Sequence, residues 1–158
     1  MISGRRAEGE TIETKDINIL TRGLGGLIPR SVAKRAVSIS VKTDCKQYES
    51  GEPVKITIQI RNRIPFPIEV VTSGRRIWGW RVDGLLEASD EKLHEASEPR
   101  SFSMQARESR TLQREWDGRF KRDGTPTRWE PADRGEHEIT AFLATDPPKS
   151  DSTVIELR

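Results

Sequence analysis

Cysteine, histidine and long apolar runs are all scarce in this sequence of 158 residues. Cys45 is the single cysteine, so neither a disulfide within the chain nor a zinc site of several cysteines can form. No apolar run approaches the ~18 residues that a membrane-spanning helix needs, and the first residues lead into charge instead of an apolar signal core. We therefore expect a cytoplasmic protein without a membrane span, in a compartment that keeps its thiol reduced.

Charge is present in quantity but is unevenly distributed. Charged residues and hydrophobic residues each make up 33% of the chain, which indicates a modest core and a well-solvated surface. Residues 1–36 hold 7 Lys/Arg and 4 Asp/Glu, whereas the rest of the chain holds 20 and 21. The excess of positive charge therefore belongs to the amino-terminal segment.

Alternation of apolar and polar residues, typical of half-buried strands, begins at Val37. It is clearest from Val54 to Ile60, and it recurs at residues 68–72, 77–82, 102–104, 111–116, 137–145 and 152–157. On the strand at 77–82, Trp78 and Trp80 share a face, so both rings are expected to enter the core. Turn signals such as Asp83-Gly84 and Asp117-Gly118 separate these runs.

This pattern predicts an all-β fold, an immunoglobulin-like β-sandwich of seven or eight strands with an irregular amino-terminal arm. The expected division is a flexible basic arm at residues 1–36 and the sandwich at residues 37–158. Between residues 17 and 36 the arm is apolar but broken by glycine, with room for a helical turn at Ser31 to Ala36.

Catalytic and ligand-binding motifs are not evident. His94 and His137 are the two histidines, and neither belongs to a catalytic spacing, so both are interpreted as surface or hydrogen-bonded structural residues. The acids form no calcium-loop spacing, and Gly23-Leu24-Gly25-Gly26 is not followed by the Lys-Ser/Thr of a phosphate-binding loop. We expect no catalytic residues, no metal site and no cofactor, and hence no enzyme.

Two segments are candidates for binding. The arm places four cations near apolar Leu24, Leu27 and Ile28, a mixture that suits an RNA–protein surface or an acidic partner; a disordered or self-packed tail is the alternative. The loop from Asp117 to Gly135 combines Arg with aromatic residues, as interface hot spots do, although Trp129 beside Pro131 could equally cover the end of the sandwich. The candidate binding residues are Arg22, Arg30, Lys34 and Arg35 in the arm, and Arg119, Phe120, Arg122, Arg128 and Trp129 in the loop.

Three stretches of the sequence carry a resemblance to a known family. They are Tyr48 to Val54 leading into a strand and Asn62, Ser73-Gly74 before an aromatic strand, and Glu115-Trp116-Asp117-Gly118 before Asp123-Gly124. Over residues 48–143 the chain resembles the intracellular proteinase inhibitor family of Bacillus type, an immunoglobulin-like domain. That family has a Gly-x-Tyr strand where this chain has Gly135-Glu136-His137, so His137 stands in place of an aromatic residue.

Two hypotheses of function follow. The resemblance implies a non-catalytic protein-binding module whose partner is a protein, with a protease as the family's own target. The alternative is a ribosome- or nucleic-acid-associated protein that docks through residues 17–36. The sequence does not indicate an oligomeric state.

Overall fold

A computed structural model describes residues 28–93 and 98–158 of the chain. It contains the short helix α2, Arg30–Ala36, and twelve strands in these residues. The eight longer strands fall where alternation predicts them; the four additional ones, β2, β6, β9 and β10, span only two to four residues each. The strands are β1 Val37–Thr43, β2 Gln47–Tyr48, β3 Val54–Asn62, β4 Ile68–Thr72, β5 Trp78–Val82, β6 Leu85–Leu86, β7 Arg100–Met104, β8 Ser109–Trp116, β9 Arg119–Arg122, β10 Arg128–Pro131, β11 Gly135–Leu143 and β12 Lys149–Leu157.

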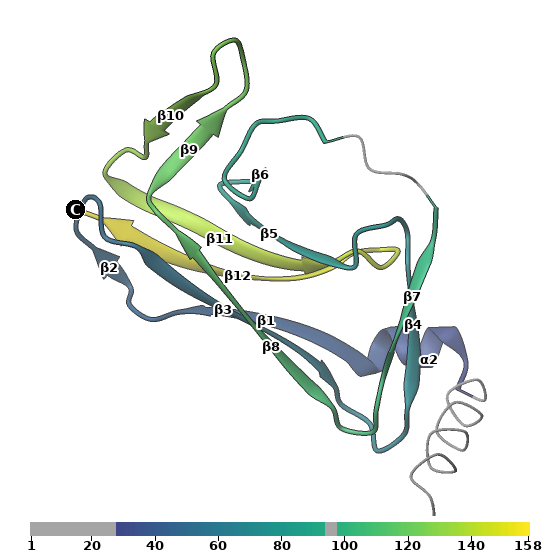
Figure 1. Cartoon of the computed structure of the whole chain (residues 1–158). Helices are drawn as coiled ribbons and strands as arrows, with labels where there is room; N and C mark the ends of the chain where they lie inside the picture. The colour runs from purple at the N-terminus through teal and green to yellow at the C-terminus, as the bar shows by residue number, and fades with distance from the viewer. Residues whose placement is uncertain (1–27, 94–97) are drawn as a thin grey trace, which may run out of the picture.

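Two main sheets form the layers of a β-sandwich (Figure 1). One has the order β1-β3-β8 and the other β2-β12-β11-β5-β6, while β4 pairs with β7 and β9 with β10. By their sheet partners, these strands correspond to A-B-E and G-F-C of the immunoglobulin fold, with β4 as an additional strand between B and C. The predicted immunoglobulin-like β-sandwich is thus confirmed.

Apolar side chains at alternate positions fill the space between the sheets. Strand β3 shows this most regularly, because Val54, Ile56, Ile58 and Ile60 are all buried between exposed or half-exposed neighbours. The two tryptophans of β5 behave differently from each other. Trp80 is buried as predicted, whereas Trp78 is only half-buried and has the guanidinium of Arg114 at 4.8 Å from its ring centroid.

Helix α2 packs on the sandwich, although it lies before the boundary predicted between residues 36 and 37. Ala33 and Ala36 are buried in the core cluster, and the Arg63 amide donates to the Ala36 carbonyl at 3.0 Å. Side chains on one helical face recur every three to four residues, so this spacing puts both methyl groups on the inner face. The structure therefore places residues 30–36 with the sandwich, and it confirms the helical turn that the sequence allowed. Residues 1–27 lie outside the described residues.

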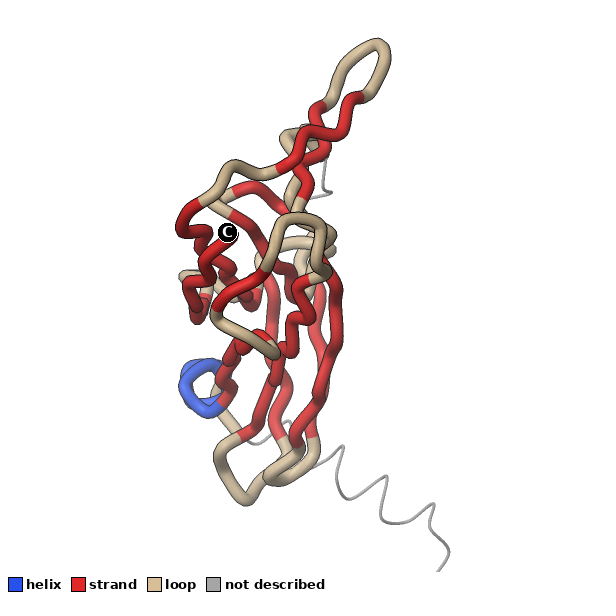
Figure 2. Tube along the Cα trace, turned by 90° about the vertical axis from the view of Figure 1, so that its left-hand side faces the viewer, coloured by secondary structure: helices blue, strands red, loops and turns tan. Residues whose placement is uncertain are grey.

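The β9–β10 hairpin and helix α2 lie at opposite ends of the molecule. Figure 1 shows the hairpin above the sheets and the helix at their lower end, and the view turned by 90° shows the hairpin extending beyond the rest of the fold (Figure 2). The candidate binding residues therefore belong to two separate surfaces.

Candidate functional site

The hairpin starts at a turn that the sequence dictates. Gly118 has φ +77, a left-handed conformation that glycine adopts without strain, and Asp117 Oδ1 accepts from the Arg119 amide at 3.0 Å. The indole nitrogen of Trp116 then donates to the Arg119 carbonyl at 2.8 Å. These contacts fix the direction in which β9 leaves the sandwich.

A cluster of aromatic rings and one imidazole supports the base of the hairpin. The ring centroid of Phe120 lies 5.5 Å from that of Trp116 and 6.2 Å from that of His137. The centroids of Trp116 and His137 are 5.7 Å apart. Both nitrogens of His137 are hydrogen-bonded, Nδ1 to Asp83 Oδ2 at 2.6 Å and Nε2 to the Asp133 carbonyl at 2.7 Å. The imidazole thus fills an aromatic position and also ties three segments together.

His137 is therefore a hydrogen-bonded structural residue, which is one of the two interpretations that the sequence allowed. Burial by itself lowers the pKa of the imidazole, but the hydrogen bonds to the Asp133 carbonyl and to the Asp83 carboxylate outweigh it and raise the pKa above its ordinary value. Because both ring nitrogens face acceptors, the doubly protonated ring satisfies this arrangement best. The Asp83-Gly84 turn was predicted from sequence, but its role as the partner of His137 was not.

The two faces of the hairpin differ in composition. Arg119 pairs with Pro131 and Lys121 with Trp129, so these four side chains share one face by alternation. Trp129 is 56% exposed, so more than half of its surface is left free by the rest of the fold. Large exposed aromatic side chains next to cations are typical of protein-binding surfaces.

Ion pairs hold the hairpin on both faces, because on the Trp129 face Lys121 Nζ contacts Glu91 Oε2 at 3.0 Å. Arg122 contacts Glu130 at 2.9 Å and Asp90 at 3.8 Å, and the Lys121 amide donates to the Ala88 carbonyl at 2.9 Å. Arg122 is thus committed to contacts within the protein. This bracing keeps the hairpin from moving independently of the 88–90 segment.

The five predicted loop residues therefore have different roles. The prediction that Phe120 binds a partner is wrong, because its ring is buried against Trp116 and His137. Arg119, Arg128 and Trp129 are exposed on the hairpin. A small groove of about 170 Å³ adjoins the exposed face at its base, where Arg119, Pro131 and Arg134 are among the lining residues.

The predicted arm residues lie at the other end of the fold. Arg30 and Lys34 line a groove of about 560 Å³ beside Thr72, Ser73 and Asp146. Arg35 is exposed, and its carbonyl accepts from the Arg63 guanidinium at 2.9 Å. Arg22 and His94 lie outside the described residues.

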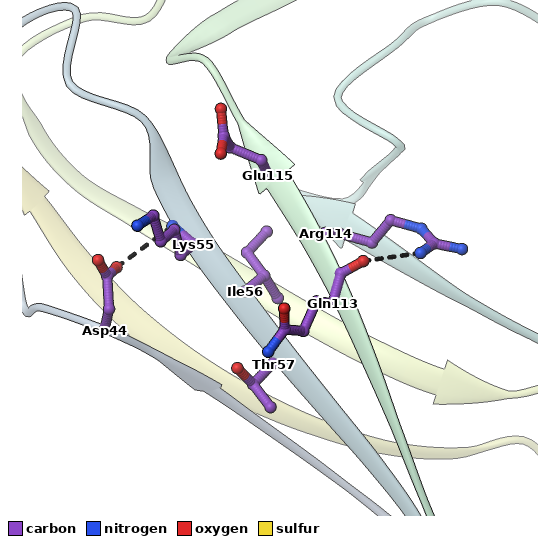
Figure 3. Close-up of a pocket in the computed structure, with 7 residues that line it drawn as sticks. All are labelled: Asp44, Lys55, Ile56, Thr57, Gln113, Arg114 and Glu115. Carbon is purple, nitrogen blue, oxygen red and sulfur yellow. Dashed lines mark hydrogen bonds between the residues drawn. The ribbon is translucent and has the colours of Figure 1, made fainter.

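A third groove, of about 610 Å³, crosses the outer face of the β1-β3-β8 sheet (Figure 3). Asp44, Lys55 and Glu115 are among its lining residues, and the Lys55 amide donates to Asp44 Oδ1 at 3.2 Å. The Tyr48 hydroxyl donates to the same oxygen of Asp44 at 2.5 Å and lowers the pKa of that carboxyl, while burial and then Asp44 raise the pKa of Tyr48 to about 12. Sequence reasoning did not find this groove, because its residues come from two strands, β3 and β8, and from Asp44 just after β1, without a common motif.

Residues 28–93 and 98–158 also bear on metal binding and on insertion into a membrane. No group of three or more His, Cys, Asp or Glu side chains there could hold a metal ion. None of the helices in this part of the chain has the length and apolar character needed to traverse a bilayer.

Comparison with known proteins gives a family and distant structural similarities. A CARDB domain from Pyrococcus furiosus, solved as a crystal structure with di-metal ions, has a TM-score of 0.46 and 10% identity over 77% of this chain and 87% of that chain. A solution structure of the same domain has a TM-score of 0.47 and 9% identity, over 77% of this chain and 94% of that chain. A β-glucosidase from Listeria innocua has a TM-score of 0.43 and 14% identity, over 77% of this chain but only 16% of the enzyme.

These similarities carry no argument about function, and the immunoglobulin-like topology follows from the strand order of the chain itself. No curated protein matches the chain. The match to a family extends over residues 25–158 and so includes helix α2 as well as every strand. The chain belongs to the family of unknown function DUF7974.

Proposed function

We propose that the protein is a non-catalytic protein-binding module that contacts its partner through the exposed face of the β9–β10 hairpin. The observation that carries this proposal is Trp129, which is 56% exposed on a hairpin that extends beyond the sandwich (Figure 2). An indole in this position has apolar area to bury and an N–H to donate, and Trp is enriched among interface hot spots.

The hairpin is braced before any partner arrives, which favours tight binding. Its base is packed on Trp116 and His137, and Arg122 bridges Glu130 and Asp90. Binding to a preorganised element loses less conformational entropy than binding to a flexible loop. Covering the exposed part of the indole, on the order of 100 Å², would contribute about 2.5 kcal/mol, or roughly 50- to 100-fold in Kd.

The test compares Trp129→Ala with Phe66→Ala. Phe66 is a matched control because it is also 56% exposed, but it lies in the connection between β3 and β4. Full-length protein, immobilised on beads, would capture partners from the host lysate, and the Kd of each purified partner would then be measured by calorimetry. We expect Trp129→Ala to weaken binding roughly 50- to 100-fold and Phe66→Ala to leave it within a factor of two. Equal effects of both substitutions, or none from Trp129→Ala, would contradict the proposal.

The nature of the partner is a separate question. The resemblance to intracellular proteinase inhibitors predicts that it is a protease, and a panel of intracellular serine proteases at stoichiometric protein concentration tests this directly. Inhibition that Trp129→Ala abolishes would support both statements. If every protease keeps full activity, the inhibitory form fails, and the capture experiment still decides whether the hairpin binds another protein.

A further inference from the structure

Six cationic side chains gather around helix α2, at the end of the fold away from the hairpin. The Arg63 guanidinium donates to the Arg35 carbonyl at 2.9 Å, the Arg107 guanidinium donates to the Arg63 carbonyl, and Lys149 Nζ donates to the Val37 carbonyl at 2.6 Å. Lys34 and Arg30 line the groove beside this cluster. We call these six residues the α2 cation cluster: Arg30, Lys34, Arg35, Arg63, Arg107 and Lys149.

The structure leaves this charge largely unneutralised. Among the described residues, no member of the cluster takes part in an ion pair, and three of them are held by backbone carbonyls instead of carboxylates. Asp146 is the carboxylate that lines the groove with Arg30 and Lys34. Burial lowers the pKa of Lys149, and the charges of Arg63 and Lys34 lower it further, so the potential around this ammonium is positive.

Helix capping accounts for only part of the cluster. Cations near the last turn of a helix are stabilised by its dipole, which is equivalent to about half an elementary charge. Six cations opposed by that half charge and by Asp146 leave an excess of roughly four to five positive charges. An excess of this size on one surface favours a polyanionic partner.

We propose that the α2 cation cluster binds the phosphate backbone of a nucleic acid without reading its bases. Counterion release gives a polyphosphate strong affinity for such a surface, whereas exposed pairs with the carboxylates of an acidic protein contribute only ~0–1 kcal/mol each. Four of the six cations are arginines, whose planar guanidinium suits phosphate geometry. Val32 is the exposed large apolar residue of α2, which is too little for insertion into a membrane surface. The β3–β4 connection that carries Arg63 also carries Phe66, which is 56% exposed and offers a ring on which any base can stack.

The first measurement is fluorescence anisotropy of the full chain with a labelled 20-nucleotide uridine RNA and a labelled 20-base-pair DNA. Both are titrated between 50 and 200 mM NaCl. With four to five phosphates neutralised, log Kobs should fall with log[salt] with a slope of about −3 to −4, which corresponds to a loss of about 10²-fold over this range. Absence of binding at 50 mM NaCl, or a slope near zero, would overturn the proposal.

The second measurement locates the surface. A variant with Arg30→Gln, Lys34→Gln and Arg35→Gln should reduce the magnitude of the slope by about 2. The control carries Lys42→Gln, Lys46→Gln and Lys55→Gln, which removes the same charge from exposed positions outside the cluster and should leave the slope within ~0.5. Equal effects of both triple variants would show that net charge alone matters and would overturn the assignment to this surface.

Three further measurements keep the test decisive. Thermal unfolding of each variant shows whether it is folded; if the triple variant is not, Arg30→Gln alone replaces it, because Arg30 is exposed and makes no side-chain hydrogen bond among the described residues. Phosphatidylserine vesicles and a polyglutamate peptide serve as competitors. Stronger binding to either than to both nucleic acids would assign the surface to a membrane or an acidic protein and refute the proposal. The hairpin variant Trp129→Ala should bind nucleic acid like the original protein, which separates this test from that of the proposed function.

Discussion

Removing helix α2 should cost the sandwich a measurable part of its stability. A chain beginning at Val37 lacks the buried methyl groups of Ala33 and Ala36, which are 1% and 5% exposed, and it lacks the Ala36 carbonyl that accepts from the Arg63 amide. Two buried methyl groups contribute about 1.6 kcal/mol and one backbone hydrogen bond about 1 kcal/mol, so we expect a loss of about 2.5 kcal/mol before counting the newly exposed surface beneath the helix. A tail that does not pack would change the stability by about 0.5 kcal/mol or less.

The reference for this comparison is a chain beginning at Ile28, which retains all described residues of the helix. Urea unfolding followed by tryptophan fluorescence gives the free energy of unfolding of both chains, and calorimetry gives their Tm. For a domain of this size the expected difference corresponds to about 10 °C in Tm. The reasoning is refuted if the two chains unfold within ~0.5 kcal/mol of each other.

Two point substitutions within the full chain test the same packing without a truncation. Ala33→Glu places a carboxylate on the buried face of α2 and should destabilise the protein by more than about 2 kcal/mol. The adjacent Val32→Glu changes a residue that is 43% exposed and should stay within about 0.5 kcal/mol. Similar effects of both substitutions would show that the two faces of the helix are not differently buried.

Three further predictions concern the core. The pKa of His137 is raised in the native state, so between the two pKa values the native state binds more protons than the unfolded chain. The contribution of His137 to stability should therefore be full below pH ~6.5 and be lost as the pH rises through the native pKa. Urea midpoints between pH 6 and pH 9 should show this fall, and His137→Phe should remove it; an unchanged pH profile would contradict the assigned protonation. A Cβ at Gly79 would lie 2.6 Å from Phe142 Cζ, so Gly79→Ala should destabilise by about 1–3 kcal/mol, and Phe142→Leu should restore part of the loss, which a double-mutant cycle measures. The fully buried Asn62 amide donates to the carbonyls of Phe66 and Gln105 at 2.7 and 2.8 Å, so Asn62→Ala should cost about 2–4 kcal/mol in chemical denaturation, and a loss below ~0.5 kcal/mol would show that water replaces these bonds.

The strands of the sandwich could be predicted because each carries its own signal. In β3 the alternation of isoleucine with polar residues follows directly from one face being buried, and the same holds, less regularly, for β1 and β11. The Asp117-Gly118 turn was predicted from the sequence, and Gly118 adopts φ +77 there, shortly after the buried Trp116. Such features depend on neighbours in the sequence and need no knowledge of distant contacts.

The hairpin could not be predicted as a pair of strands. Residues 119–122 and 128–131 carry mostly charged or polar side chains, so alternation is weak, and pairing with each other and with residues 88–90 makes them strands. For the same reason Phe120 and Trp129 look equivalent in sequence. Their exposure differs because the register pairs Trp129 with Lys121 and Phe120 with Glu130, which puts the two rings on opposite faces of the hairpin.

The all-β class, the eight longer strands and the turns between them follow from local sequence patterns, because the period of two and the residues of tight turns are local properties. Contacts between residues far apart in the chain are set by the folded arrangement. The joining of His137 to Asp83 results from the pairing of β11 with β5. The packing of Ala33 and the gathering of Arg63 and Lys149 around α2 result from how the helix and the sheets come together. Long-range contacts of this kind leave no periodic pattern in the sequence, because the two partners meet through their position in space and not through their spacing along the chain.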